Sequence, residues 1–281
     1  VCPAGSVVPS EQCWICYCNN DCGSYSYQYL TGSTALVPGV WYHVAAVFSE
    51  SQDSMAVYLN GTLDNNLTLH SSYNLYHWGH YEFIGYNDGQ WWSSNYFDGL
   101  IDEVRVSDTA RTSFQLTTNS SVSNWTHPAV VSVRVNAIPV IDSVKVTPGT
   151  MQQYGPLGLP GVDEYTLAWW KMDEGSGSTM GDEMGNYLGQ FANDPEWTDG
   201  RFGKALYFDE EDDDYVYMSS GEELTTDGDY TIEAWIKLET TGRNHGIYQN
   251  RHNSQTSYPN VAFGVTSSEA LAFHVYFDGL R

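Results

Sequence analysis

The sequence predicts an all-β protein, and three observations support this fold class. Aromatic residues make up 15% of the 281 residues, and the 21 tyrosines outnumber both the phenylalanines and the tryptophans. Aromatic side chains favour strands. Short apolar or alternating runs are separated by turn residues, and no stretch shows a long helical period. We therefore expect many short strands joined by turns.

A first group of expected strands lies in the N-terminal half of the chain. DSMAVYLNGTLDNN enters a turn at Asn60-Gly61, where the pair supplies the positive φ of a tight hairpin. The other strands of this group are SYSYQYL (24–30), the largely apolar GVWYHVAAVFS (39–49), YEFIGYNDG (81–89) and FDGLIDEVRVS (97–107).

A polar boundary follows this group, and a second group of strands begins after it. TTNSSVSNWTHP ends at Pro128, and a Gly- and Pro-rich stretch covers residues 151–161, so we expect residues 119–164 to be a connector with two short strands. The later strands are YTLAWWKMDEGSGS (165–178), LGQFANDPEWTDGRFGKALYF (188–208), DYVYMSS (214–220), DYTIEAWIKLET (229–240), PNVAFGVTSS (259–268) and ALAFHVYFDG (270–279).

Spaced motifs in both groups resemble the laminin-G-like, or concanavalin A-like, jelly-roll family. WKMDEGSG (170–177), GRFGKALYFDEEDDDYV (200–216) and YTIEAWIK (230–237) resemble the opening half of that domain. WYHVAAVF (41–48), VYLNG (57–61) and FDGLIDEVRVSDTAR (97–111) resemble its closing half. The resemblance implies an antiparallel jelly-roll sandwich that is split or circularly permuted, because the closing half precedes the opening half.

The swapped order defines four segments and leaves three arrangements open. Neither half is a viable sandwich alone, because each would expose an apolar sheet face and strand edges. The chain is then a circular permutant, one period of a tandem array, or a subunit completed head-to-tail by its neighbour. Joining the chain ends would make residues 270–279 and 24–30 consecutive strands. The segments are a Cys-rich loop and strand (1–33), the closing half (34–118), the connector (119–164) and the opening half (165–281).

The charge of the chain restricts its partners. The net charge is −24, from 35 acidic and 11 basic residues, and such a surface disfavours nucleic acid and anionic lipid. It suits bound cations or neutral partners such as glycans. The chain begins with Val1, without a signal peptide or a long apolar run, so we expect a processed chain or an excerpt and no membrane insertion.

Cysteines and sequons indicate an extracellular or cell-surface protein. All five cysteines lie within the first 22 residues, where a disulfide-stapled loop is the favoured interpretation and a zinc site the alternative. Four Asn-X-Ser/Thr sequons favour export and glycosylation. The cysteines are Cys2, Cys13, Cys16, Cys18 and Cys22, and the sequon asparagines are Asn60, Asn66, Asn119 and Asn124.

The acidic residues suggest two kinds of site. Glycoside hydrolases of this fold carry E-x-D-x-x-E on one strand, but Glu210-x-Asp212 is followed by Tyr215 where the last acid is required, so we predict no enzyme. The family resemblance implies a structural Ca²⁺ ion, with Asp102, Asp173 and Asp182 as ligand candidates. Strict alternation would place Asp102 on an apolar face with Leu100 and Val104, where either a cation or backbone N–H groups must pair with it.

Aromatic loops suggest a glycan-binding site, because sugars stack their apolar faces on such rings. The candidates are Trp78, Trp91, Trp92 and Tyr96, in the loops YNLYHWGHY and DGQWWSSNY. The alternative is that these rings pack against the other half, the connector or a neighbouring subunit.

Two functions follow from these features. The first is a non-catalytic extracellular structural or adhesive module that assembles head-to-tail with copies of itself, or with neighbouring repeats, into a surface filament or array. The second is a carbohydrate-binding, lectin-like adhesion domain of a larger secreted protein.

Overall fold

The computed structural model describes two pieces of the chain, which together form an all-β sandwich. The described residues are 25–69, 73–75, 81–87, 95–114, 162–219, 224, 228–251 and 259–280. We call residues 25–114 the first piece and residues 162–280 the second piece. No helix occurs among the described residues, and therefore none there could cross a bilayer.

Nine strands come from the first piece and ten from the second. The first piece contains β1 (Tyr25–Ala35), β2 (Tyr42–Ser49), β3 (Ser54–Leu59), β4 (Thr62–Thr68), β5 (Tyr73–Leu75), β6 (Tyr81–Ile84), β7 (Tyr86–Asn87), β8 (Asn95–Tyr96) and β9 (Gly99–Ser107). The second contains β10 (Thr166–Trp170), β11 (Thr179–Met180), β12 (Gly189–Ala192), β13 (Glu196–Asp199), β14 (Lys204–Phe208), β15 (Tyr215–Ser219), β16 (Tyr230–Leu238), β17 (His245–Arg251), β18 (Pro259–Val265) and β19 (Ala270–Leu280).

The strands form two large antiparallel sheets and one short hairpin. The order in the nine-stranded sheet is β1-β19-β18-β17-β6-β15-β12-β11, with β5 also paired to β19. The order in the eight-stranded sheet is β13-β14-β9-β16-β2-β3-β4, with β10 also paired to β9. Strands β7 and β8 pair only with each other. The hydrophobic core lies between the two large sheets, where Phe48 of β2 contacts Phe277 of β19 at 5.7 Å between ring centroids.

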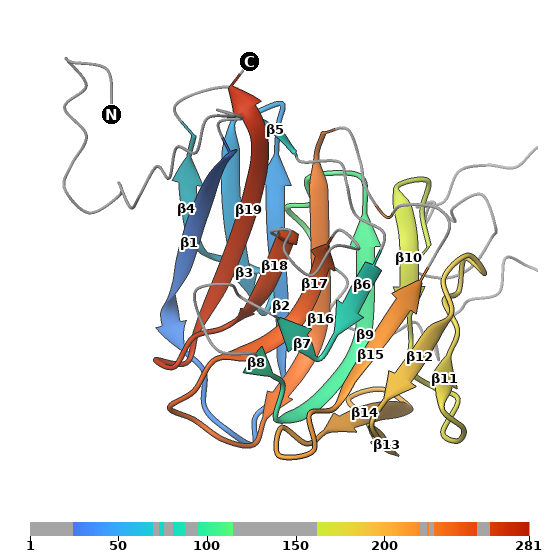
Figure 1. The fold of residues 1–281 in the computed structure, drawn as a ribbon. Helices are drawn as coiled ribbons and strands as arrows, with labels where there is room; N and C mark the ends of the chain where they lie inside the picture. The colour runs from blue at the N-terminus through green and yellow to red at the C-terminus, as the bar shows by residue number, and fades with distance from the viewer. Residues whose placement is uncertain are drawn as a thin grey trace, which may run out of the picture.

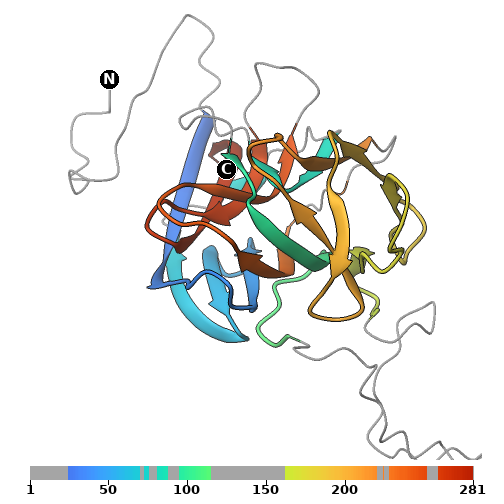
Figure 2. The ribbon, with the colours of Figure 1, turned by 90° about the horizontal axis from the view of Figure 1, so that it is seen from below.

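Both pieces contribute to both sheets, and their strands interleave. Strand β16 of the second piece lies between β2 and β9 of the first, while β6 of the first lies between β15 and β17 of the second. Figure 1 shows blue β1 beside red β19, and Figure 2 shows the same mixture of early and late strands from below. Among the described residues, the strands of both pieces thus complete each large sheet within one chain. The expected neighbours 24–30 and 270–279 are antiparallel partners as β1 and β19.

Side-chain alternation builds the core, as the sequence predicts for most strands. In β19 the four residues Leu271, Phe273, Val275 and Phe277 are fully buried in the core, and His274 of the other face is half-buried. This pattern is the period of two that a strand with one face on a core requires. The core draws on both pieces, so each piece alone would leave apolar residues of this core exposed.

Strand β9 departs from the predicted alternation because it contains a bulge. Glu103 has a φ of 56°, and the pairing register with β16 shifts at this point. Ile101 and Val104 therefore both face the core, whereas Leu100 and Asp102 lie opposite residues of β16 that point outward. The prediction that Leu100, Asp102 and Val104 share one face is wrong, because the extra residue changes the face of every residue after it.

Candidate functional site

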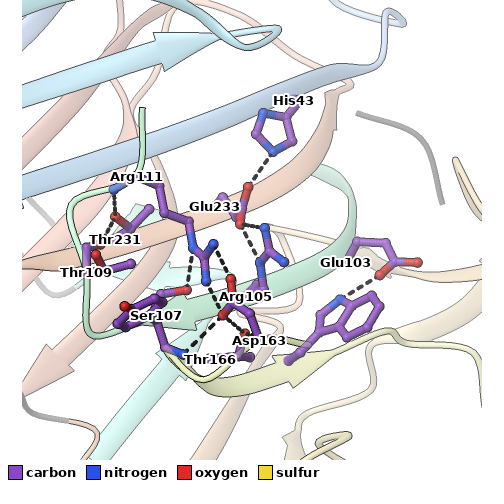
Figure 3. A network of polar contacts seen from close by, with 12 residues as sticks. His43, Glu103, Arg105, Ser107, Thr109, Arg111, Asp163, Thr166, Thr231 and Glu233 are labelled. Carbon is purple, nitrogen blue, oxygen red and sulfur yellow. Dashed lines mark hydrogen bonds and ion pairs between the residues drawn. The ribbon is translucent and has the colours of Figure 1, made fainter. Parts of the chain in front are cut away.

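The outer face of the eight-stranded sheet is covered by the segment that follows β9. We call residues 108–114 the strap. The backbone N–H of Arg111 in the strap donates to Thr231 Oγ1 of β16 at 3.0 Å. Phe114 at its end contacts the rings of His43 and Tyr58, with centroids 5.3 and 5.0 Å apart. The strap therefore buries polar side chains on this face, and these form the network in Figure 3.

Glu233 is the centre of one part of this network. Its carboxylate is buried and lies between the Arg105 guanidinium and His43 Nε2, which is 3.0 Å away (Figure 3). Burial alone would raise the pKa of Glu233, but the charge of Arg105 and the contact with His43 outweigh burial and lower the pKa to about 2. The carboxylate is therefore ionised and paired at neutral pH.

Arg111 of the strap links the end of the first piece to the start of the second. Its guanidinium donates two hydrogen bonds of 2.7 Å to Asp163 and one of 2.9 Å to Ser107 (Figure 3). Burial would raise the pKa of Asp163, but the Arg111 contact lowers it to about 2. This paired, two-bond geometry is the strongest form of an Arg–carboxylate contact. Residues 111 and 163 are therefore neighbours in space.

Two adjacent carboxyl groups at the β9 bulge are buried and only partly paired. Asp102 Oδ2 accepts the N–H of Phe202, and Glu103 Oε2 accepts the indole N–H of Trp169 at 2.7 Å. Asp102 Oδ1 and Glu103 Oε1 are buried without a hydrogen-bond partner. Burial raises the pKa of Asp102 to about 8 and that of Glu103 to about 7, although their hydrogen bonds oppose the shift. Asp102 therefore carries a proton at neutral pH.

The three calcium-ligand candidates do not form a ligand set. Both carboxylate oxygens of Asp182 accept backbone N–H groups, four in all. Asp173 Oδ1 accepts the N–H of Lys204, and Asp102 accepts that of Phe202. Calcium requires six to eight oxygen ligands, and the described part of the chain holds no group of three or more metal-binding side chains. Backbone N–H groups, the alternative considered for Asp102, are the observed partners.

The acidic stretch 209–214 is a turn that its own carboxylates stabilise. Asp214 is buried and accepts the N–H groups of Asp194 and Asp209 at 2.9 and 3.0 Å. Glu211, Asp212 and Asp213 are exposed. The interpretation of this stretch as a solvated acidic turn agrees with this geometry.

A group of aromatic rings lies on the outer face of the nine-stranded sheet, and we call it the tyrosine cluster. Tyr86 is at its centre, with ring centroids 5.0 Å from Tyr96, 5.4 Å from Tyr215 and 5.6 Å from Phe83. All of its members are half-buried, so each ring keeps an exposed part. The members are Tyr81, Phe83, Tyr86, Tyr96, Tyr215 and Tyr217.

Strand register places these rings on one face. Tyr217 of β15 lies directly opposite Phe83 of β6, while their neighbours Val216 and Ile84 pair on the core side. Cross-strand pairs of aromatic residues stabilise a sheet. The Tyr217 hydroxyl donates to Gln190 at 3.2 Å, which fixes one edge of the cluster.

Two glycines allow the β7–β8 hairpin to complete the cluster. Gly85, with a φ of 81°, turns the chain sharply between β6 and β7, and its N–H donates to the carbonyl of Ile247. The hairpin then lies against β17 at Gly246, where any Cβ would clash with the backbone nitrogen of Asn87. Tyr86 and Tyr96 thereby reach the rings of β6 and β15. Burial, followed by the charge of Asp213, raises the pKa of the Tyr96 hydroxyl.

The structure places only some of the predicted site residues. Tyr96 belongs to the cluster, whereas Trp78, Trp91 and Trp92 lie outside the described residues. Tyr81, the last residue of the predicted loop YNLYHWGHY, also belongs to the cluster. Phe83, Tyr86, Tyr215 and Tyr217 were missed, although Tyr215-Val-Tyr217 alternates in the sequence in the manner of an exposed aromatic stripe.

Two of the four sequon asparagines lie on the β3–β4 hairpin. Asn60 and Asn66 are both exposed there, and Asn60 Oδ1 accepts the N–H of His43 at 3.0 Å. Asn119, Asn124 and the five cysteines lie outside the described residues.

Comparison with known proteins gives one result. Residues 5–117 match a laminin G-type family model, described as the concanavalin A-like lectin/glucanases superfamily. No curated protein and no solved structure matches the chain. Residues 165–281, which resemble the opening half of such a domain, lie outside the match.

Proposed function

We propose that the chain is a carbohydrate-binding adhesion module that holds sugars on its tyrosine cluster, because residues 5–117 match a family model described as the concanavalin A-like lectin/glucanases superfamily. One observation carries the proposal. Six half-buried rings pack against one another on an outer sheet face, although the core lies on the other side of that sheet. Aromatic rings that gather outside the core and keep an exposed part are candidates for a binding surface.

The chemistry of the cluster suits a sugar. A tyrosine presents an apolar ring face, against which the C–H groups of a pyranose stack, and a hydroxyl that donates and accepts hydrogen bonds. The amide of Asn95, which precedes Tyr96 in β8, offers a further polar group. Because the rings already contact each other, binding orders few side chains and loses little entropy.

The proposed function is binding rather than turnover. Laminin G-like domains are in general non-catalytic, and the cluster offers tyrosines where a glycoside hydrolase needs a pair of carboxyl groups. The neighbouring Asp214 is already committed to two backbone N–H groups. Export is part of the proposal, and the exposed positions of Asn60 and Asn66 are compatible with attached glycans.

Head-to-tail assembly with copies of the same chain is a second candidate function. The interleaved halves permit it, because every strand contact between the two pieces could equally be made between two chains.

The experiment that tests the sugar site is a glycan array probed with the intact chain and two variants. Tyr215→Ala removes a ring that contacts four other rings of the cluster, so we expect binding about tenfold weaker or more. Tyr27→Ala is the matched control, because Tyr27 is an exposed tyrosine of β1 that contacts Tyr276 instead. Circular dichroism checks that both variants fold. An array without bound glycans, or equal losses in both variants, would refute the proposal.

A further inference from the structure

The tyrosine cluster is assembled from both pieces of the chain. Phe83, Tyr86 and Tyr96 come from the first piece, whereas Tyr215 and Tyr217 come from the second. If the first piece of one chain paired with the second piece of another, each tyrosine cluster would therefore contain rings from two chains.

The contacts between the pieces also form a defined interface. Strands β16 and β6 each lie between two strands of the other piece. Three buried or half-buried ion pairs cross the same boundary: His43–Glu233, Arg105–Glu233 and Arg111–Asp163. A buried carboxylate that loses its partner is costly, so each piece strongly prefers the full complement of the other to partial pairing.

We propose that the first piece of one copy pairs with the second piece of another, so that two chains share each tyrosine cluster. One of the two tests below measures glycan binding, and that test rests on the proposed sugar site. All strand pairs and ion pairs described above are recreated in such an exchange, and only the path of the connector differs. Residues 115–161 can span more than 100 Å when extended, so their length permits both arrangements.

Concentration decides between closure within one chain and exchange. The effective concentration of two linked pieces is in the millimolar range for short flexible linkers and falls for longer ones. Pairing of strands so distant in sequence is slow, which leaves open edges available to a second copy during folding. We therefore expect exchanged dimers when the chain folds at high local concentration and closed monomers when it folds in dilute solution.

A complementation experiment tests the exchange. Tyr86→Ala damages the cluster from the first piece, and Tyr215→Ala damages it from the second. The two variants are unfolded, mixed in equal amounts and refolded at high concentration. Exchange gives mixed dimers with one intact cluster each, so about one quarter of all clusters should regain glycan binding in random mixing. Variants refolded separately and then mixed are the control and should show no recovery.

A second readout does not depend on sugar binding. Leu100 of β9 lies directly opposite Lys237 of β16, and these positions belong to different pieces. Leu100→Cys on one chain and Lys237→Cys on another should form an interchain disulfide after joint refolding at high concentration, identified by peptide mass. If only monomers form, without this disulfide, at every concentration, the exchange proposal is wrong. If the disulfide forms but no glycan binds, exchange stands and the sugar site fails.

Discussion

Replacing Asp102 by asparagine should stabilise the protein at neutral and alkaline pH while leaving it nearly unchanged in mild acid. Asp102 is fully buried, one of its carboxylate oxygens has no partner, and burial raises its pKa from 3.8 to about 8. The unfolded chain releases this proton near pH 4, but the folded protein keeps it up to about pH 8. The folded state therefore loses relative stability as the pH rises between these values.

The size of the effect follows from the pKa difference. At pH 7 the raised pKa of Asp102 lowers the free energy of unfolding by about 4 kcal/mol, because each pKa unit corresponds to 1.36 kcal/mol. Near pH 4 the term is close to zero. The asparagine is neutral at every pH, and its amide oxygen can still accept the N–H of Phe202. The free energy of unfolding of the variant should thus equal that of the parent at pH 4. It should exceed the parent's value by a growing amount as the pH rises to 8.

Urea denaturation followed by tryptophan fluorescence at several pH values between 4 and 9 measures this difference. Asp212→Asn is the matched control, because it removes one acidic group from an exposed turn. A gap between Asp102→Asn and the parent that stays constant with pH would show that Asp102 is ionised in the folded protein, and the reasoning from burial would be wrong.

Three further predictions concern the contacts between the pieces and the hairpin. Glu233→Gln leaves Arg105 buried beside a neutral group, so the free energy of unfolding should fall by about 3 to 5 kcal/mol; a loss below 1 kcal/mol in chemical denaturation would contradict this. Arg111→Ala removes both hydrogen bonds to Asp163, so limited proteolysis should cleave the strap faster, whereas an unchanged rate would mean that the strap is held elsewhere. Gly246→Ala displaces the β7–β8 hairpin, so glycan binding should fall more than thermal stability does; unchanged binding would place the sugar away from the hairpin.

Local patterns predict most of the strands and the side of the sheet that each residue faces. Strand β19 alternates strictly, and its four apolar residues are the ones buried in the core. The motif around residues 97–111 lies in the part of the chain that matches the laminin G-type family model. The position of a strand and the burial of its side chains depend on a few neighbouring residues, so the sequence alone is sufficient to predict them.

The parts that the sequence did not predict depend on long-range contacts or on unusual backbone conformations. The β9 bulge rests on Glu103 in a left-handed conformation, which no residue type at that position announces. The tyrosine cluster requires Phe83 to pair with Tyr217, far apart in the sequence. The backbone N–H groups that bind Asp182 likewise depend on a local turn geometry that residue types do not specify. Single-sequence patterns contain little information about such pairings.

The pairing of β1 with β19 has a mechanical consequence for the sandwich. Tyr25 and Asp278 lie opposite each other at one end of this antiparallel pair. Tension applied between these two points would load the first hydrogen bonds of the ladder, then the next, and so separate the strands in sequence. Tension applied between Tyr25 and Ala270, at the opposite end of β19, would load all hydrogen bonds of the pair at once, in shear. The direction of pull, as well as the number of bonds, would therefore set the force at which this part of the sandwich opens.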